Sequence, residues 1–144
     1  MSEAVKQART CLETGDVPVG AVVVRRDEIV GVGRNRREDK KNALWHAEIC
    51  AINDACEKLG GWRLWECDLY VTLEPCAMCA GAISNSRIRK VFFGASDPKA
   101  GAYGGAFDAR LLPLNHKPLV AGGIMEEECS EILKSFFEEV RKMK

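Results

Sequence analysis

The chain has 144 residues and no net formal charge; 47% of its residues are hydrophobic and 29% are charged. These values are ordinary for a globular domain and exclude a disordered or membrane-spanning chain, because the longest apolar runs fall far short of the ~20 residues of a transmembrane helix. The balanced charge also lacks the excess of base that is common in proteins that follow phosphate backbones. We expect one domain over residues 1–144.

The first half of the chain predicts a helix, a hairpin and a second helix. Apolar residues recur at helical spacing over 5–12, and Gly15 provides a stop. Two β-branched runs within 21–30 flank a short polar segment, a pattern typical of a β-hairpin. A polar loop over 34–42 then leads into a helix that we expect to begin near His46 and to end before the next pair of glycines.

The second half alternates strands and helices. Residues 68–73 form an apolar run, which predicts a strand buried on both faces, and Pro75 is expected to open a helix because proline is tolerated at a first helical position. Strands are predicted at 91–93 and 119–121, separated by a long glycine-rich stretch. Residues 126–142 form an amphipathic helix, acidic at its start and basic at its end. This alternation favours an α/β fold with a mixed sheet covered by helices on both faces.

The seven cysteines cannot all pair within one chain. No secretion signal opens the sequence, so we expect a cytoplasmic protein with reduced cysteines. Cys76 and Cys79 stand out because they form a Cys-x-x-Cys pair. The other five are interpreted as small buried apolar residues: Cys11, Cys50, Cys56, Cys67 and Cys129.

A metal site is predicted by His46 together with Cys76 and Cys79. One imidazole and two thiolates give three ligands, and catalytic zinc sites use three protein ligands where structural sites use four. Cys50, one helical turn after His46, is the next candidate, but a site at the start of the helix would leave it pointing along the flank. We therefore expect zinc where two helix N-termini converge, with their N–H groups facing the thiolates.

Glu48 is the predicted catalytic residue. Two thiolates cancel the charge of Zn²⁺, so water on the metal is acidified less than on three neutral histidines, and a base is needed. We expect Glu48 to take a proton from that water, to protonate the ring of a substrate, and to pass a second proton to a departing amine. His-x-Glu followed after 26 residues by Pro-Cys-x-x-Cys is the known signature of zinc nucleobase deaminases.

Three other interpretations of these residues stay open. A closed structural zinc site would make Glu48 a solvated acid in the first turn of its helix, and a zinc-stabilised binding module would need no catalysis. A redox dithiol formed by Cys76 and Cys79 would leave His46 and Glu48 unexplained.

Over nearly its whole length the sequence resembles the tRNA adenosine deaminase family and its nucleoside-deaminase relatives. The resemblance implies a cytidine-deaminase-like three-layer α/β/α sandwich with a five-stranded sheet. It also implies a homodimer with a tRNA anticodon loop bound across the pair. The matching segments are 17–24, 33–36, 46–48, 70–82, 93–95, 115–116 and 136–137.

The same resemblance assigns substrate contacts to Asn35, Ala47 and Pro75. An amide both donates and accepts hydrogen bonds, which suits a purine edge, although an asparagine-capped turn explains Asn35 equally well from sequence alone. Basic residues at 87–90 and in the C-terminal tail are expected to bind phosphates.

The predicted function is hydrolytic deamination of a nucleobase, first of all adenosine to inosine at the tRNA wobble position. The alternative is a deaminase of a free base or nucleoside, such as guanine or cytosine, with the same zinc chemistry. Trp45 and Tyr103 keep this alternative open because they depart from the family's usual residues beside the expected pocket.

Overall fold

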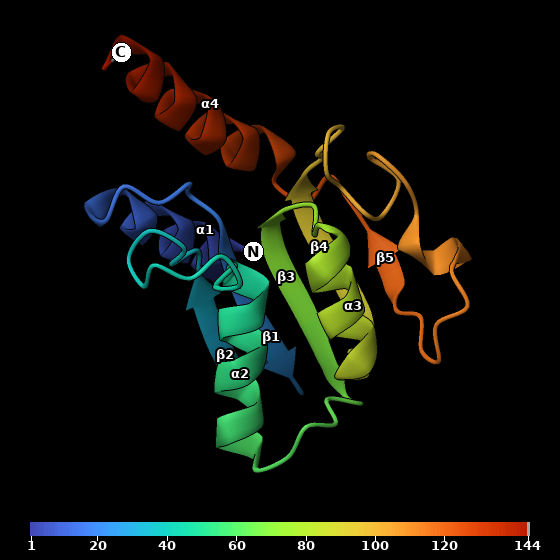
Figure 1. Cartoon of the computed structure of the whole chain (residues 1–144). Coiled ribbons are helices and arrows are strands. Elements are labelled where there is room, and N and C mark those ends of the chain that lie inside the picture. Colours follow the sequence, from blue (N-terminus) through green and yellow to red (C-terminus); the bar gives the residue numbers. More distant parts are fainter. Residues whose placement is uncertain (144) are drawn as a thin grey trace.

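The computed structural model describes residues 1–143, which form a mixed five-stranded sheet with helices on both faces (Figure 1). The sheet order is β2-β1-β3-β4-β5. The strands are β1 (Gly20–Arg25), β2 (Glu28–Arg34), β3 (Cys67–Leu73), β4 (Lys90–Ala95) and β5 (Leu119–Ala121). The helices are α1 (Ser2–Thr10), α2 (Ala47–Leu59), α3 (Ala77–Asn85) and α4 (Glu126–Lys142), with 3₁₀ turns at Cys11–Glu13 and Ala109–Leu111. The predicted three-layer architecture is confirmed.

The sheet combines an antiparallel half with a parallel half. β1 pairs antiparallel with both β2 and β3, while β3, β4 and β5 run parallel. The predicted hairpin is confirmed: β1 and β2 are joined by Arg26 and Asp27, whose φ angles of 50° and 65° lie in the left-handed region. Two such residues form the type I′ turn that matches the twist of paired strands.

The start of α3 differs from the prediction. Pro75 does not open the helix, because Cys76 is its N-cap and Ala77 its first residue. Cys76 has an extended backbone, with φ −78° and ψ 178°. An extended residue is what allows the chain to leave the end of β3 and turn into a helix. The Cys76 sulfur therefore lies at the helix N-terminus and not on its flank.

The helices are divided between the two faces of the sheet. In Figure 1, α2 and α3 lie side by side on one face, while α1 and α4 lie on the other. α2 packs very closely on β2: a Cβ atom at Gly33 would lie 2.4 Å from the Ala47 carbonyl oxygen. Glycine at this position is therefore required to hold the first turn of α2 against the sheet.

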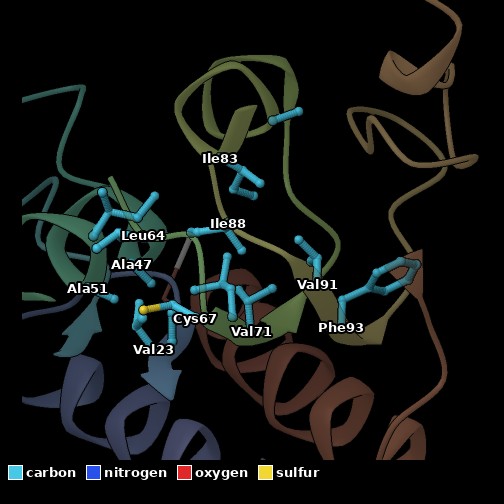
Figure 2. Packing of buried hydrophobic residues seen from close by; sticks show 14 of the residues in the cluster. Val23, Ala47, Ala51, Leu64, Cys67, Val71, Ile83, Ile88, Val91 and Phe93 are labelled. Carbon is cyan, nitrogen blue, oxygen red and sulfur yellow. The ribbon is translucent and has the colours of Figure 1, made fainter. Parts of the chain in front are cut away.

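The largest buried apolar cluster fills the space between the sheet and the α2–α3 layer. Figure 2 shows Val23 and Val71 of the sheet close to Ala47 and Ala51 of α2, with Ile83 of α3 nearby. Ala47 is fully buried and lies between His46 and Glu48 in the chain. The core thus fixes the end of α2 that carries the predicted site.

No helix in residues 1–143 combines the length and apolar character needed to cross a bilayer.

Candidate metal centre

Two helix N-termini meet beside the carboxyl ends of β3 and β4, as the sequence predicts. His46 is the N-cap of α2 and Cys76 the N-cap of α3, and both have extended backbones. Cys79 lies in the first turn of α3, so its side chain faces the same end of the helix. An N-cap position directs a side chain toward the helix end and its free N–H groups.

The three predicted ligands lie within reach of one metal ion. The His46 Nδ1 atom is 3.6 Å from the sulfur atoms of both Cys76 and Cys79. All three ligand atoms lie within 4.8 Å of one another. Tetrahedral zinc with N and S ligands separates them by roughly 3.5 Å, given the usual bond lengths. The donor set therefore fits zinc.

The predicted exclusion of Cys50 also agrees with the structure. Cys50 is outside this group and lines a separate hollow with Trp45 and Asn53. His116 contacts the Ile88 carbonyl oxygen through Nε2, at 2.6 Å. Within residues 1–143, the only group of ligands with this geometry is His46, Cys76 and Cys79.

The two thiols have opposite pKa shifts. A hydrogen bond from Cys79 lowers the pKa of Cys76, and contacts with His46 and the Cys79 backbone N–H lower it further. The same bond to Cys76, together with burial, raises the pKa of Cys79. The surroundings of Cys76 therefore favour the thiolate form that a metal ligand requires.

Glu48 is almost completely buried, with 4% of its surface exposed. Burial raises the pKa of its carboxyl group to about 7, although its own backbone N–H and His46 oppose the rise. Glu48 lies close enough to Cys79 to raise the pKa of that thiol. A carboxyl group with this pKa can both take and give a proton near neutral pH.

Glu48 opens onto a cavity of about 200 Å³ beside the ligands. An apolar cavity of ~150 Å³ accommodates benzene, so this one has room for a single nucleobase. Its lining residues come from the segment before β1, the loop after β2, the start of α2, and the ends of β3 and β4. They are Val17, Val19, Asn35, Arg37, His46, Ala47, Glu48, Leu73, Glu74, Cys76, Asp97 and Ala100.

Two of the three predicted substrate contacts line the cavity and the third does not. Asn35 and Ala47 line the cavity, whereas Pro75 is fully buried between two lining residues, Glu74 and Cys76. Asn35 also forms the turn that was its alternative interpretation. Its Nδ2 donates to the Val17 carbonyl and its Oδ1 accepts from the Arg37 N–H, both at 3.1 Å.

Among the other expectations about the surroundings of the pocket, the one for Trp45 needs revision. Trp45 lies in the separate hollow with Cys50, not in the cavity lining. Tyr103 is buried, and its hydroxyl makes no hydrogen bond with residues 1–143. The basic segment 87–90 follows the C-terminal end of α3, roughly 13 Å along the helix axis from Cys76.

Sequence reasoning missed four charged residues around the cavity. Arg37, Glu74 and Asp97 line it directly, and Asp16 is fully buried behind the loop that follows β2. Only Glu74 carried a usable signal, because it is an acidic residue at the end of an apolar strand, two residues before a predicted ligand. The role of Asp16 becomes visible only in the structure, where it contacts Arg34, Glu38 and Asp39, which are 18 to 23 residues away in the sequence.

Comparison with known proteins identifies the family. The profile of the MafB19-like deaminase family matches residues 1–141. The chain is 48% identical over 147 residues to the tRNA-specific adenosine deaminase of Bacillus subtilis strain 168, covering all of this chain and 90% of the relative. It is 45% identical to the tRNA-specific adenosine deaminase of Rickettsia bellii, covering 98% of this chain and 99% of the relative.

Solved structures agree with this assignment. A structure from studies of A-to-I editing by tRNA:A34 deaminases at the wobble position of transfer RNA has a TM-score of 0.87, with 45% identity over 92% of this chain and 97% of the other. A guanine deaminase from Nitrosomonas europaea has a TM-score of 0.78, with 26% identity over 94% and 81% of the two chains. The chain therefore belongs to the MafB19-like deaminase family and, as the sequence resemblance implied, is similar along its length to tRNA-specific adenosine deaminases.

Proposed function

We propose that this enzyme converts adenosine to inosine at the wobble position of a tRNA anticodon. The observation that carries the proposal is a His-Cys-Cys cluster beside a buried glutamate and a base-sized cavity, in a chain 48% identical to a tRNA-specific adenosine deaminase. Because the proposed substrate is tRNA, the cytoplasm is the proposed compartment.

We propose zinc as the metal, held by His46, Cys76 and Cys79. The 3.6 Å separations and the imidazole-thiolate donor set support this choice. Zinc, when bound, supplies a Lewis acid that makes water a stronger nucleophile at neutral pH. Elemental analysis of the purified protein should find about one zinc per chain.

Glu48 is the proposed proton carrier. Its carboxyl group is buried at the cavity, where it can take a proton from water, hold it, and release it to the ring nitrogen of the base. The carboxyl group would then take the second proton of the attacking water and pass it to the amino group, which leaves as ammonia while the oxygen remains as a carbonyl. Burial raises the pKa of this carboxyl group to about 7, which suits a group that must both take and give protons near neutral pH.

Asn35, Ala47 and Pro75 are the proposed substrate contacts. Each end of the Asn35 amide makes one hydrogen bond within the protein, which leaves one N–H and one lone pair for a purine edge. Ala47 lines the cavity but is fully buried, so it would act by holding the first turn of α2 beside the ring. Pro75 would act by fixing the backbone between the Glu74 and Cys76 walls of the cavity.

A homodimer is the proposed assembly. Gly81 is partly exposed on α3, and a Cβ atom placed there would meet nothing within 4 Å, so this flank has room for close packing. Sedimentation should give about twice the 15.9 kDa of one chain. A species of one chain at working concentration would contradict the dimer.

The substrate is tested by incubating the purified protein with tRNA transcripts, with free adenine, guanine and cytosine, and with their nucleosides. We expect inosine in an anticodon loop, loss of activity when neighbours of the target adenosine are changed, and a Michaelis constant that rises steeply with salt. Free guanine is included because the chain is also similar in structure to a guanine deaminase. Ammonia released from guanine, without inosine in any tRNA, would replace the proposal with free-base deamination.

A further inference from the structure

Glu74 is a buried carboxylate in the cavity wall that has no assigned role. It follows β3 and precedes Pro75 and the ligand Cys76, and only 3% of its surface is exposed. Its oxygens accept four hydrogen bonds, all from residues 96–105, which we name the glycine-rich loop. The donors are Ser96 Oγ (3.2 Å) and the backbone N–H groups of Asp97 (3.0 Å), Tyr103 (2.9 Å) and Gly105 (2.9 Å).

The charge of Glu74 is compensated by these donors alone. No arginine or lysine in residues 1–143 forms an ion pair with its carboxylate. A buried carboxylate without a cation needs several hydrogen bonds to remain charged, and the loop supplies all of them. The conformation of the loop and the burial of the charge therefore depend on each other.

Gly101 and Gly105 allow the backbone of the glycine-rich loop to lie close to the Glu74 carboxylate. A Cβ atom at Gly101 would lie 2.3 Å from Cδ of Glu74, and one at Gly105 would lie 2.6 Å from Oε1. Any larger residue would push the backbone away from the oxygens. The backbone at these two positions lies so close to the carboxylate that no residue with a Cβ atom fits there without a shift.

The glycine-rich loop is also one wall of the cavity. Asp97 and Ala100 both line it, and the Asp97 carboxylate accepts from the Ala100 N–H at 3.2 Å. The N–H of Ala102 donates to the Pro75 carbonyl at 2.8 Å. Glu74 and Pro75 thus connect this wall directly to the segment that carries Cys76.

We propose that Glu74 is a positioning residue for the substrate: it holds the glycine-rich loop at the distance from the metal centre that a nucleobase requires. This inference rests on the proposed deaminase function and assigns one of its specificity elements. Glu74 does not act on the reacting atoms. Its loss therefore weakens substrate binding more than it slows the turnover of bound substrate.

The test is Glu74→Gln, which keeps the shape but removes the charge and places an NH₂ group against at least one backbone N–H donor. With an RNA stem-loop substrate we expect the Michaelis constant to rise about tenfold or more, with kcat changed less and zinc content unchanged. Glu66→Gln is the matched control. Its carboxylate is 52% exposed and pairs with Arg25 and Arg26, so this variant should behave as wild type.

Hydrogen exchange separates this inference from the proposed function, because it needs no substrate. The amides of Asp97, Tyr103 and Gly105 should exchange faster in Glu74→Gln, while those of β3 and β4 stay protected. Faster exchange together with a raised Michaelis constant supports the inference. An unchanged Michaelis constant, or a loss of zinc, overturns it even if the wild type edits tRNA. Failure of wild type to edit tRNA would instead reject the function.

A second variant covers the case in which Glu74→Gln does not fold. Gly105→Ala leaves the carboxylate in place, but the new Cβ atom would lie 2.1 Å from the Asp97 carbonyl oxygen, so the loop must shift. We expect the same rise in the Michaelis constant with zinc retained. A Michaelis constant equal to that of wild type would contradict the positioning role.

Discussion

The metal centre and the walls of the cavity are built in different ways. The metal centre uses residues close together in sequence at two helix starts, His46 with Glu48 and Cys76 with Cys79. The walls are loops held by hydrogen bonds to buried carboxylates that lie 22 to 31 residues away in the sequence. The metal ligands are thus positioned by local sequence, whereas the cavity walls are positioned by contacts between residues far apart in the sequence.

The two walls also differ from each other. Asp16 holds the loop after β2 through the N–H groups of Glu38 and Asp39, and it pairs with the buried Arg34 at 3.5 Å. Glu74 holds the glycine-rich loop with hydrogen-bond donors alone. The first wall thus depends on a buried ion pair and the second on close backbone approach.

The largest effect should come from the metal centre. Glu48→Gln keeps the size of the side chain but cannot carry protons, so kcat should fall ~10²–10⁴-fold while zinc stays bound. Stopped assays with parallel elemental analysis measure both quantities. Cys79→Ser is the contrast: it removes a ligand, and zinc should be lost as well. Normal turnover by Glu48→Gln would reject the proton-carrier role.

Asp16 holds the loop after β2, so a substitution there should affect activity less than one at the metal centre but should have a large effect on stability. Asp16→Asn removes one of the two carboxylates that pair with the buried Arg34 and leaves Asp39, at 3.3 Å, so the free energy of unfolding should fall by less than the about 3–5 kcal/mol that an uncompensated buried charge costs. Urea unfolding at neutral pH measures this loss. A loss below about 1 kcal/mol would mean that the pair is not a major support.

The same variant has a defined pH dependence. Burial acts to raise the pKa of Asp16, but hydrogen bonds from Thr14, Glu38 and Asp39, with the charge of Arg34, outweigh it and hold the pKa below 3.8. Asp16 therefore stabilises the fold fully above pH 3.8, and this contribution is lost as the pH falls through the lower folded pKa. The difference in unfolding free energy between wild type and Asp16→Asn should shrink in that acid range. A constant difference would contradict it.

The smallest effect is expected at Tyr103, whose backbone is held by Glu74 but whose hydroxyl is buried without a partner in the described chain. Burial, and then the charge of Glu48, raises the pKa of this hydroxyl, so it stays protonated. Tyr103→Phe should change the unfolding free energy by less than about 1 kcal/mol, and kcat by less than about fivefold. A much larger fall in kcat at unchanged stability would assign the hydroxyl to the substrate or to a bound water.

Much of the fold was predictable because its signals are local. Hydrophobic periodicity located the helix over Glu126–Lys142 and the strand at Leu119–Ala121 as the structure has them. The prediction that Pro75 opens a helix was wrong, because proline fixes its own φ but does not decide whether the next residue is helical. Here Cys76 is extended, since the chain must turn from β3 into α3.

By itself, the sequence determined the metal ligands and Glu48 as candidates, because short fixed spacings at helix starts place side chains at the same end of a helix. Only the tertiary structure decided which residues form the cavity around them. Arg37 and Glu74 line it, Trp45 does not, and the donors to Glu74 lie up to 31 residues away. Such contacts depend on how strands are ordered in the sheet and how closely backbones approach, and neither leaves a periodic trace in the sequence.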